Sequence, residues 1–126
     1  MSKATFKVPG DLSLEVDADY STTGQFRCFK LSGGQATIAT AQGESAPLVL
    51  QNKPTAAGDH GHFTYAGVSS VELGGTVAAL GPLTTGTGGA LEAAITGDQV
   101  VGIALEAGVT GDVISAILGI GGAPLA

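Results

Sequence analysis

Two histidines separated by one residue are the most chemically suggestive feature of the sequence. Asp59, His60 and His62 lie within four residues, and alternate side chains of a β-strand share one face, so both imidazoles would point the same way. Imidazole and carboxylate groups are zinc ligands. However, the neighbouring sequence contains no third strong metal ligand, and Phe63 would lie on the opposite face of the strand. We therefore predict no metal site, with His60, His62 and Thr64 on the solvent side of a strand and Asp59, His60 and His62 as the only metal candidates.

Nucleophilic and phosphate-binding chemistry is also disfavoured. Cys28 is the single cysteine and lies in the apolar run Phe26–Leu31, where a free thiol packs as a small hydrophobe. The Gly-rich stretch Gly81–Gly89 has Thr87 and Gly88 where a phosphate-binding loop requires Lys and then Ser or Thr, so we expect a flexible loop. No nucleophile elbow or paired-carboxylate spacing is present. We predict no catalytic residue, no cofactor and no enzymatic activity.

The charge distribution excludes several partner classes. The net charge is −6, and all five Lys and Arg residues fall within the first 53 of the 126 positions. A face that binds nucleic acid or anionic membrane needs clustered basic groups, so we expect neither partner. The N-terminus has no apolar stretch of signal-peptide length, and the long uncharged stretches are interrupted by Gly, Pro and Thr, so we expect neither export nor a transmembrane segment.

The chain divides into three zones on composition. Residues 1–24 are the most polar and form an extended N-terminal arm or edge segment, residues 25–118 form a β-rich body, and residues 119–126 are a Gly/Ala/Pro tail. In the arm, Lys3, Phe6, Lys7 and Val8 make an amphipathic extended piece that could add to the sheet edge of a partner. The alternative is an end that is disordered in the free protein.

The body contains short apolar runs separated by Gly-rich turns. The composition, with 44% hydrophobic residues, 13% charged residues and 21 glycines, is typical of short strands and many turns. A short helix is the alternative for Leu91–Ile95, and the sequence contains no convincing internal repeat. We predict a mainly β, small single-domain β-barrel or β-sandwich with short strands and Gly-rich loops. The predicted strands of the body are Phe26–Leu31, Ala36–Thr40, Pro47–Gln51, Gly61–Val68, Gly75–Leu80, Gln99–Leu105 and Val113–Leu118.

Several segments of the body resemble the capsid cement, or head decoration, proteins of tailed phages and prophages. The similarity spans Phe26 to Leu118, whereas His60, His62 and the first 24 residues depart from it. The resemblance implies a small β-rich unit that sits as a homotrimer at three-fold and quasi-three-fold positions outside the expanded head and bridges major capsid subunits. It brings no catalytic or ligand residue. The matching segments are Leu50–Pro54, Ala56–Gly58, Ala66–Ser69, Gly97–Ala107 and Gly111–Ile114.

The expected function is therefore that of a structural virion protein. It would be made in the bacterial host cytoplasm and would bind the major capsid protein, with Lys3, Phe6, Lys7 and Val8 as capsid-contact candidates. A ligand- or metal-binding β module and a tail or baseplate structural protein are the alternatives. Zinc binding that depends on His60 and His62 would favour the first of these.

Overall fold

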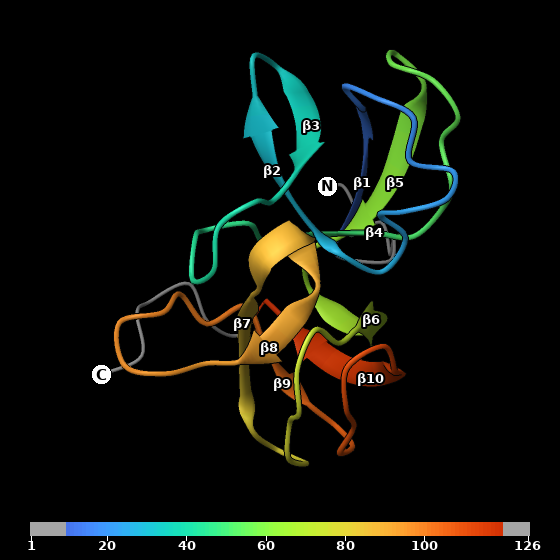
Figure 1. The fold of residues 1–126 in the computed structure, drawn as a ribbon. Coiled ribbons are helices and arrows are strands. Elements are labelled where there is room, and N and C mark those ends of the chain that lie inside the picture. Colours follow the sequence, from blue (N-terminus) through green and yellow to red (C-terminus); the bar gives the residue numbers. More distant parts are fainter. Residues whose placement is uncertain (1–9, 120–126) are drawn as a thin grey trace, which may run out of the picture.

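Two five-stranded antiparallel sheets make up the part of the chain that the computed structural model describes, residues 10–119. The first sheet lies above the second in Figure 1 and has the strand order β1-β5-β4-β2-β3, and the second has the order β6-β10-β9-β7-β8. The first sheet consists of β1 (Asp11–Glu15), β2 (Cys28–Ser32), β3 (Gln35–Ile38), β4 (Leu48–Leu50) and β5 (His60–Thr64). The second consists of β6 (Gly67–Glu72), β7 (Pro82–Thr85), β8 (Leu91–Ala93), β9 (Gly102–Ala104) and β10 (Val113–Leu118).

Both sheets have the same topology. In each, the first strand pairs with the fifth, the fifth with the fourth, the fourth with the second and the second with the third. A single parallel bridge then brings the two edges of each sheet together, between Val16 and Ala36 in the first and between Leu73 and Leu91 in the second. We call residues 11–64 the first repeat and residues 67–118 the second repeat. The chain is thus an internal structural duplication.

The backbone hydrogen bonds of the two repeats correspond in detail. The residue that follows the first strand of each repeat exchanges two backbone hydrogen bonds with a Gly-Asp pair, and both glycines have a φ of +91°. Only Gly adopts this conformation without steric strain, so both turns require it. The matching sets are Val16 with Gly58 and Asp59, and Leu73 with Gly111 and Asp112.

A second correspondence involves an uncommon backbone conformation. Among the described residues, Phe26 and Leu80 are the two non-glycine residues with positive φ, at 67° and 65°. The Phe26 amide donates to the carbonyl of Leu50, and the Leu80 amide donates to the carbonyl of Ala104. Donor and acceptor of the second bond each lie 54 positions after those of the first. Shared strain at equivalent sites indicates that the two repeats have the same backbone path.

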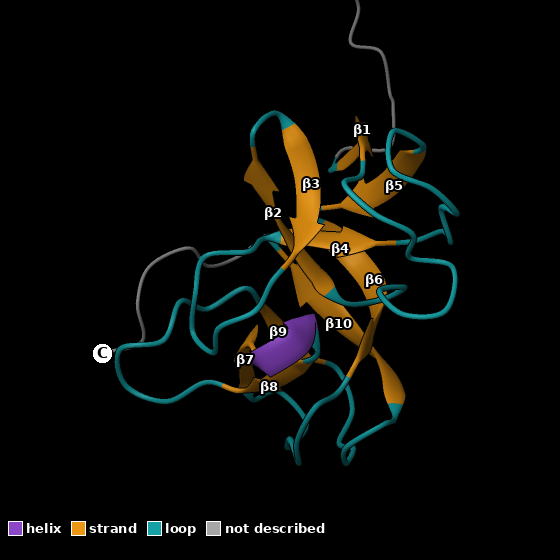
Figure 2. Cartoon of the chain, turned by 45° about the horizontal axis from the view of Figure 1, so that its top comes forward, coloured by secondary structure: helices purple, strands orange, loops and turns teal. Residues whose placement is uncertain are grey.

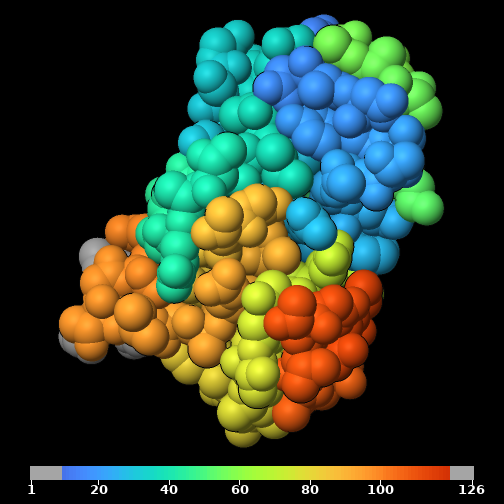
Figure 3. Space-filling view, viewed as in Figure 1, coloured from blue at the N-terminus to red at the C-terminus, as the bar shows by residue number. Residues whose placement is uncertain are grey.

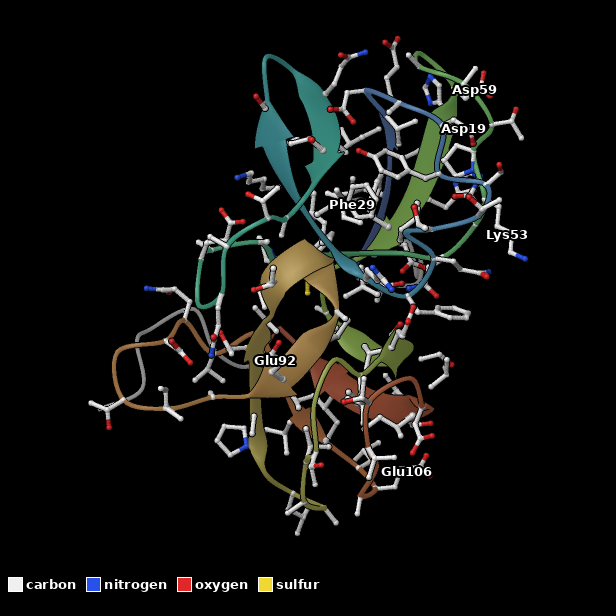
Figure 4. The ribbon with its side chains drawn as sticks, viewed as in Figure 1. Asp19, Phe29, Lys53, Asp59, Glu92 and Glu106 are labelled. Carbon is white, nitrogen blue, oxygen red and sulfur yellow. The ribbon has the colours of Figure 1, made fainter. Side chains whose placement is uncertain are left out.

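The core joins the two repeats. In the first sheet, Phe29 packs edge-to-face against Tyr20 and Phe63, with ring centroids 4.7 and 5.3 Å apart, and Figure 4 shows Phe29 inside this sheet. The core of the second sheet also takes buried side chains from the first repeat, which are Cys28, Ala39, Ala46 and Val49. This shared core makes the described chain one domain, and Figure 3 shows the two repeats in continuous contact.

The predicted fold class is confirmed as mainly β, but neither sheet forms a closed barrel, because each pair of edges meets at one bridge only. Val113–Leu118 is a strand with the predicted bounds. The predicted strand Gly61–Val68 is two strands, since the chain leaves the first sheet at Tyr65 and enters the second at Gly67. The predicted strand Gly75–Leu80 is wrong, because only Val77 there makes a bridge, with Gly108.

The region around residues 81–95 was the least accurately predicted. Leu91–Ala93 is strand β8 rather than a short helix, because Thr84 and Thr85 of β7 pair with it. The expected flexible loop instead contains β7 and a 3-10 turn, η1 (Thr87–Gly89), which is the helical element drawn beside β7 and β8 in Figure 2. Thr84 and Thr85 are fully buried, which explains why their turn-like composition was misleading.

The described part of the segment assigned to the arm contributes to the first repeat. Asp11–Glu15 pairs with β5 as an edge strand, and Val16 and Tyr20 are buried in the core. Residues 1–9, which include Lys3, Phe6, Lys7 and Val8, and residues 120–126 lie outside the described residues. Within residues 10–119, no helix is long and apolar enough to cross a membrane.

Candidate interaction surfaces

The histidine pair lies on an exposed face, as predicted. His60 is opposite Glu15 and His62 is opposite Ser13 in the pairing of β5 with β1, and the Ser13 hydroxyl lies 3.1 Å from Nδ1 of His60. Thr64 was expected beside them in solvent, but it is buried and its hydroxyl donates to the Asp11 carboxylate. We call this surface of β1 and β5 the polar face.

Asp59 does not join the histidines as a ligand. Its carboxylate accepts hydrogen bonds from the amide and the hydroxyl of Thr55 within the preceding turn. No group of three or more His, Cys, Asp or Glu side chains in residues 10–119 is arranged to hold a metal ion. A shallow hollow of about 430 Å³ lies beside His62, between Asp11, Ser13 and Gln51. The geometry thus offers two neighbouring imidazoles without a third ligand.

Cys28 is buried, which confirms the prediction for this thiol. Burial raises the pKa of the Cys28 thiol to about 12. A thiol with such a pKa is protonated at neutral pH and is a poor nucleophile. Cys28 therefore acts as a packing residue between the two repeats.

A second hollow, with a volume of about 550 Å³, runs along the loop that precedes β2. Its wall includes Arg27 and Glu72, which form two parallel hydrogen bonds of 3.0 Å across the two repeats. Lys53 also borders it and has no ion-pair partner among the described residues, but its side chain points outward in Figure 4. Arg27 and Glu72 are half-buried and neutralise each other, so this hollow is a junction between the two repeats and has no unpaired buried charge among its described lining residues.

A row of apolar side chains crosses the outer surface of the second sheet. Cross-strand pairing places Val68 beside Ile117, Ile117 beside Ile103 and Ile103 beside Pro82, so one apolar row crosses four strands. Val68 is 67% exposed. Leu105 follows in the next row, where its amide donates to the carbonyl of Ser115. We call this surface the apolar face and define it by the outward-facing apolar side chains Val68, Pro82, Ile103, Leu105, Val113 and Ile117.

The apolar face has little charge. Acidic groups lie at its rim, where Glu72 is paired with Arg27 and the Glu106 carboxylate accepts a hydrogen bond from the Ser115 amide. Figure 4 shows Glu106 at the end of the second sheet that is remote from the first. This face was not predicted from the sequence. The signal that could have revealed it is the alternation of Val113, Ser115 and Ile117 with buried residues along one strand.

The described chain begins and ends at one corner of the molecule. The carbonyl of Gly10 accepts a hydrogen bond of 2.6 Å from the Tyr65 amide. A Cβ atom on Gly10 would lie within 3 Å of Ala66, and so would a Cβ atom on Gly119. Both glycines have positive φ, so a larger residue would meet both a clash and strain. The described chain therefore begins and ends against Ala66, which lies between β5 and β6 and directly precedes Gly67.

The chain resembles a known protein in structure but not in sequence. The sequence matches no protein-family model and no curated protein. The structure is similar to the crystal structure of the head fiber gp8.5 N base of bacteriophage phi29, with a TM-score of 0.65 and 19% sequence identity. The alignment covers 90% of this chain and 98% of that chain. The chain thus has the fold of a phage head fiber base over nearly all of its length.

Proposed function

We propose that this protein is a structural component of a phage virion that binds the outer surface of the expanded head. In this role it stabilises the shell by bridging major capsid subunits at three-fold and quasi-three-fold positions. The observation that carries the proposal is the likeness, over 90% of the chain, to a base domain that belongs to a head fiber. The resemblance of Phe26–Leu118 to capsid cement proteins points the same way.

The chemistry of the described surface supports a binding role over a catalytic one. The only thiol is buried and protonated, and the two histidines have no third partner for metal chemistry within residues 10–119. In contrast, the apolar face offers small and branched side chains on a rigid sheet. Such a surface suits protein contacts.

The proposed mechanism is avidity. A homotrimer that contacts several capsid subunits makes each weak contact intramolecular after the first, and overall affinity then rises by orders of magnitude. Lys3, Phe6, Lys7 and Val8 are proposed as further contacts with the major capsid protein, supplied by the segment that joins the body at Gly10. Expansion of the head would create the composite site between subunits, so unexpanded shells would not bind.

Cosedimentation tests the proposal. Purified protein is titrated onto expanded heads of its own phage that were assembled without it, with unexpanded shells as the control. We expect saturable binding in multiples of three per capsomer junction on expanded heads only. Equal binding to unexpanded shells, or no binding by protein that circular dichroism shows to be folded, would contradict the proposal.

Two accompanying measurements sharpen the test. Deletion of residues 1–9 should weaken binding while the body stays folded, whereas a longer deletion would remove β1 and the buried Val16. Mass spectrometry of separated heads and tails addresses the tail or baseplate alternative, since the protein should be found with the heads.

A further inference from the structure

The junction between the two repeats uses the outer side of the first sheet. Cys28 and Val49 pair across β2 and β4, and both are buried in the core of the second sheet. Phe29 and Leu48, the next pair along the same strands, belong to the aromatic core of the first sheet. Because neighbouring residues of a strand point to opposite faces, Cys28 and Val49 lie on the outer face. The second repeat therefore covers an apolar row on the outside of the first repeat.

The second repeat has the same row on its own outer side, and there the row is partly exposed. Pro82 and Ile103 pair across β7 and β9, and each lies 54 positions after its counterpart, Cys28 or Val49. Cys28 is fully buried and Val49 is almost so, whereas Pro82 and Ile103 are both half-buried and belong to the apolar face. Within residues 10–119, the row thus has a covering repeat at one of its two occurrences and none at the other.

The part of the second repeat that seats on the covered row is the tip of the β7–β8 hairpin. Thr85 is fully buried, and its carbonyl accepts a hydrogen bond of 2.8 Å from the amide of Gly43 in the first repeat. A Cβ atom on Gly89 would lie 2.9 Å from the carbonyl oxygen of Cys28. Figure 1 shows this hairpin tip, with its 3-10 turn η1, between the two sheets. The hairpin tip and the apolar row are therefore the two halves of the junction.

The equivalent hairpin tip of the first repeat is exposed. The β2–β3 hairpin corresponds to the β7–β8 hairpin, and Leu31 corresponds to Thr85, 54 positions later. Leu31 is 62% exposed. In Figure 1 the tip of the β2–β3 hairpin lies at the end of the molecule that is remote from the second sheet. We call this tip the hairpin end, and we call the surface of Leu80, Pro82 and Ile103 at the other end the apolar end.

The two strained residues show the same relation between junction and end. Phe26 lies at the junction, where it borders the hollow between the repeats and its carbonyl accepts a hydrogen bond of 2.8 Å from the Glu72 amide. Its counterpart Leu80 also has a positive φ but is 72% exposed. Strained backbone positions cluster at functional sites. A strained, exposed leucine at the apolar end therefore indicates a contact that the chain does not make with itself.

We infer that copies of this chain bind one another end to end, with the hairpin end of one copy seated on the apolar end of the next, as the two repeats are joined within one chain. The occupant is a second copy because both halves of the junction recur, exposed, at opposite ends of the same chain. Such a heterologous contact closes into a ring when its rotation permits. The inference rests on the proposed function only in the expectation that the ring is its homotrimer.

The test places a charge at each end separately. Leu31→Asp alters the hairpin end, and Leu80→Asp alters the apolar end with a residue that tolerates positive φ. The matched control is Val68→Asp, which puts the same charge at an exposed position of the apolar face outside the predicted contact. The counterpart of Val68 in the first repeat is Asp11, which is itself exposed beside the junction row. Circular dichroism and thermal unfolding verify the fold of each variant.

Sedimentation velocity over a series of concentrations gives the mass of each protein. We expect the wild type and the control to reach the mass of a homotrimer, and each end variant to associate at least about tenfold more weakly, because the contact would bury an unpaired carboxylate. An equimolar mixture of the two end variants should form pairs of chains and nothing larger. The intact apolar end of the Leu31→Asp chain can still receive the intact hairpin end of the Leu80→Asp chain.

Several results would overturn the inference. They are a wild type that stays monomeric at every concentration, folded end variants that associate as the wild type does, and a mixture that forms no pairs, as expected of a face-to-face contact. Loss of association in the control would also overturn it, because the contact would then extend beyond the surface that the junction uses.

Cosedimentation with expanded heads separates this inference from the proposed function. Wild-type protein that binds heads without associating with itself in solution would overturn the inference and leave head binding intact. If Leu80→Asp weakens head binding by such a monomer, the apolar end contacts a capsid subunit, and the inferred occupant is wrong. Association without head binding would support the inference and contradict the proposed function.

Discussion

Replacement of Phe29 by Ala should reduce stability sharply without dividing the protein into two unfolding units. Phe29 is fully buried and lies between two aromatic rings, Tyr20 and Phe63. Truncation of a buried Phe to Ala typically costs 3–5 kcal/mol. The loss of two edge-to-face pairs keeps this variant above the lower end of that range, at about 4 kcal/mol. A domain of this length would then melt roughly 15 °C lower.

The matched variant is Leu83→Ala in the second repeat. Leu83 is also fully buried, and it pairs with Gly102 as Phe29 pairs with Leu48, 54 positions earlier. We expect a loss of about 3 kcal/mol, because Leu83 has no aromatic neighbours in the core clusters. Both variants should unfold in one transition, since the core of the second sheet includes Cys28 and Val49 from the first repeat.

Urea unfolding monitored by far-UV circular dichroism and by tyrosine fluorescence checks both expectations. Tyr20 reports on the first repeat, and the circular dichroism signal reports on both sheets. Two separated transitions in either variant would refute the shared core. A loss below about 1.5 kcal/mol for Phe29→Ala would refute the estimate made from its packing.

Three further predictions concern backbone strain, thiol reactivity and pH. Leu80→Gly should stabilise the protein by about 0.5 kcal/mol in chemical denaturation, because Leu80 has a φ of 65° and is mostly exposed, so the relief of backbone strain outweighs the added entropy of the unfolded chain. The control Leu80→Ala keeps the strain and should not stabilise the protein. A glycine variant that is less stable than the wild type would contradict this reasoning. In the native protein at pH 8, Cys28 should not react with a thiol reagent, because its pKa is about 12. Labelling should therefore proceed only at the rate at which the protein unfolds. Rapid stoichiometric labelling of the native protein would contradict the burial of Cys28. The Glu44 carboxylate accepts hydrogen bonds from the amides of Ala41 and Thr40 and from the Lys30 ammonium group, and these bonds lower the pKa of Glu44 to about 2. Its contribution is therefore complete above its ordinary pKa of 4.5 and disappears as the pH falls toward 2. Glu44→Gln should cost about 1 kcal/mol at pH 7 and progressively less below pH 4, and equal stabilities of variant and wild type at pH 7 would exclude this role.

The sequence predicted those elements whose local pattern and tertiary environment agree. Val113–Leu118 alternates exposed and buried residues along its length, and its bounds were predicted correctly. The burial of Cys28 followed from its apolar neighbours. In β7 the local signal was misleading, because Pro82, Thr84 and Thr85 have the composition of a turn but pair on both sides within the second sheet. Tertiary pairing there overrides local preference.

The duplication was missed for a different reason. Equivalent residues are separated by 57 positions at Val16 and Leu73 but by 53 at Asp59 and Asp112, because the intervening loops differ in length. No fixed period therefore exists in the sequence. The Thr-Gly-Asp triplets at Thr96 and Thr110 suggest a repeat, yet the structural counterpart of Asp112 is Asp59 and not Asp98. The equivalence of the two repeats is therefore visible in the backbone hydrogen bonds and not in the spacing of the side chains along the sequence.

The corner formed by Gly10, Ala66 and Gly119 has a consequence for engineering. Because residues 10 and 119 both lie against Ala66, a short linker could join them and new ends could be opened elsewhere without breaking a sheet. The turn at Gly33 and Gly34 between β2 and β3 is a suitable place, since it is exposed and lies at the far tip of the first sheet in Figure 1. A protein fused at the corner of Gly10 and Gly119 would lie beside the apolar face. A protein fused at the new ends of the permuted chain, at Gly33 and Gly34, would instead project from the far tip of the first sheet.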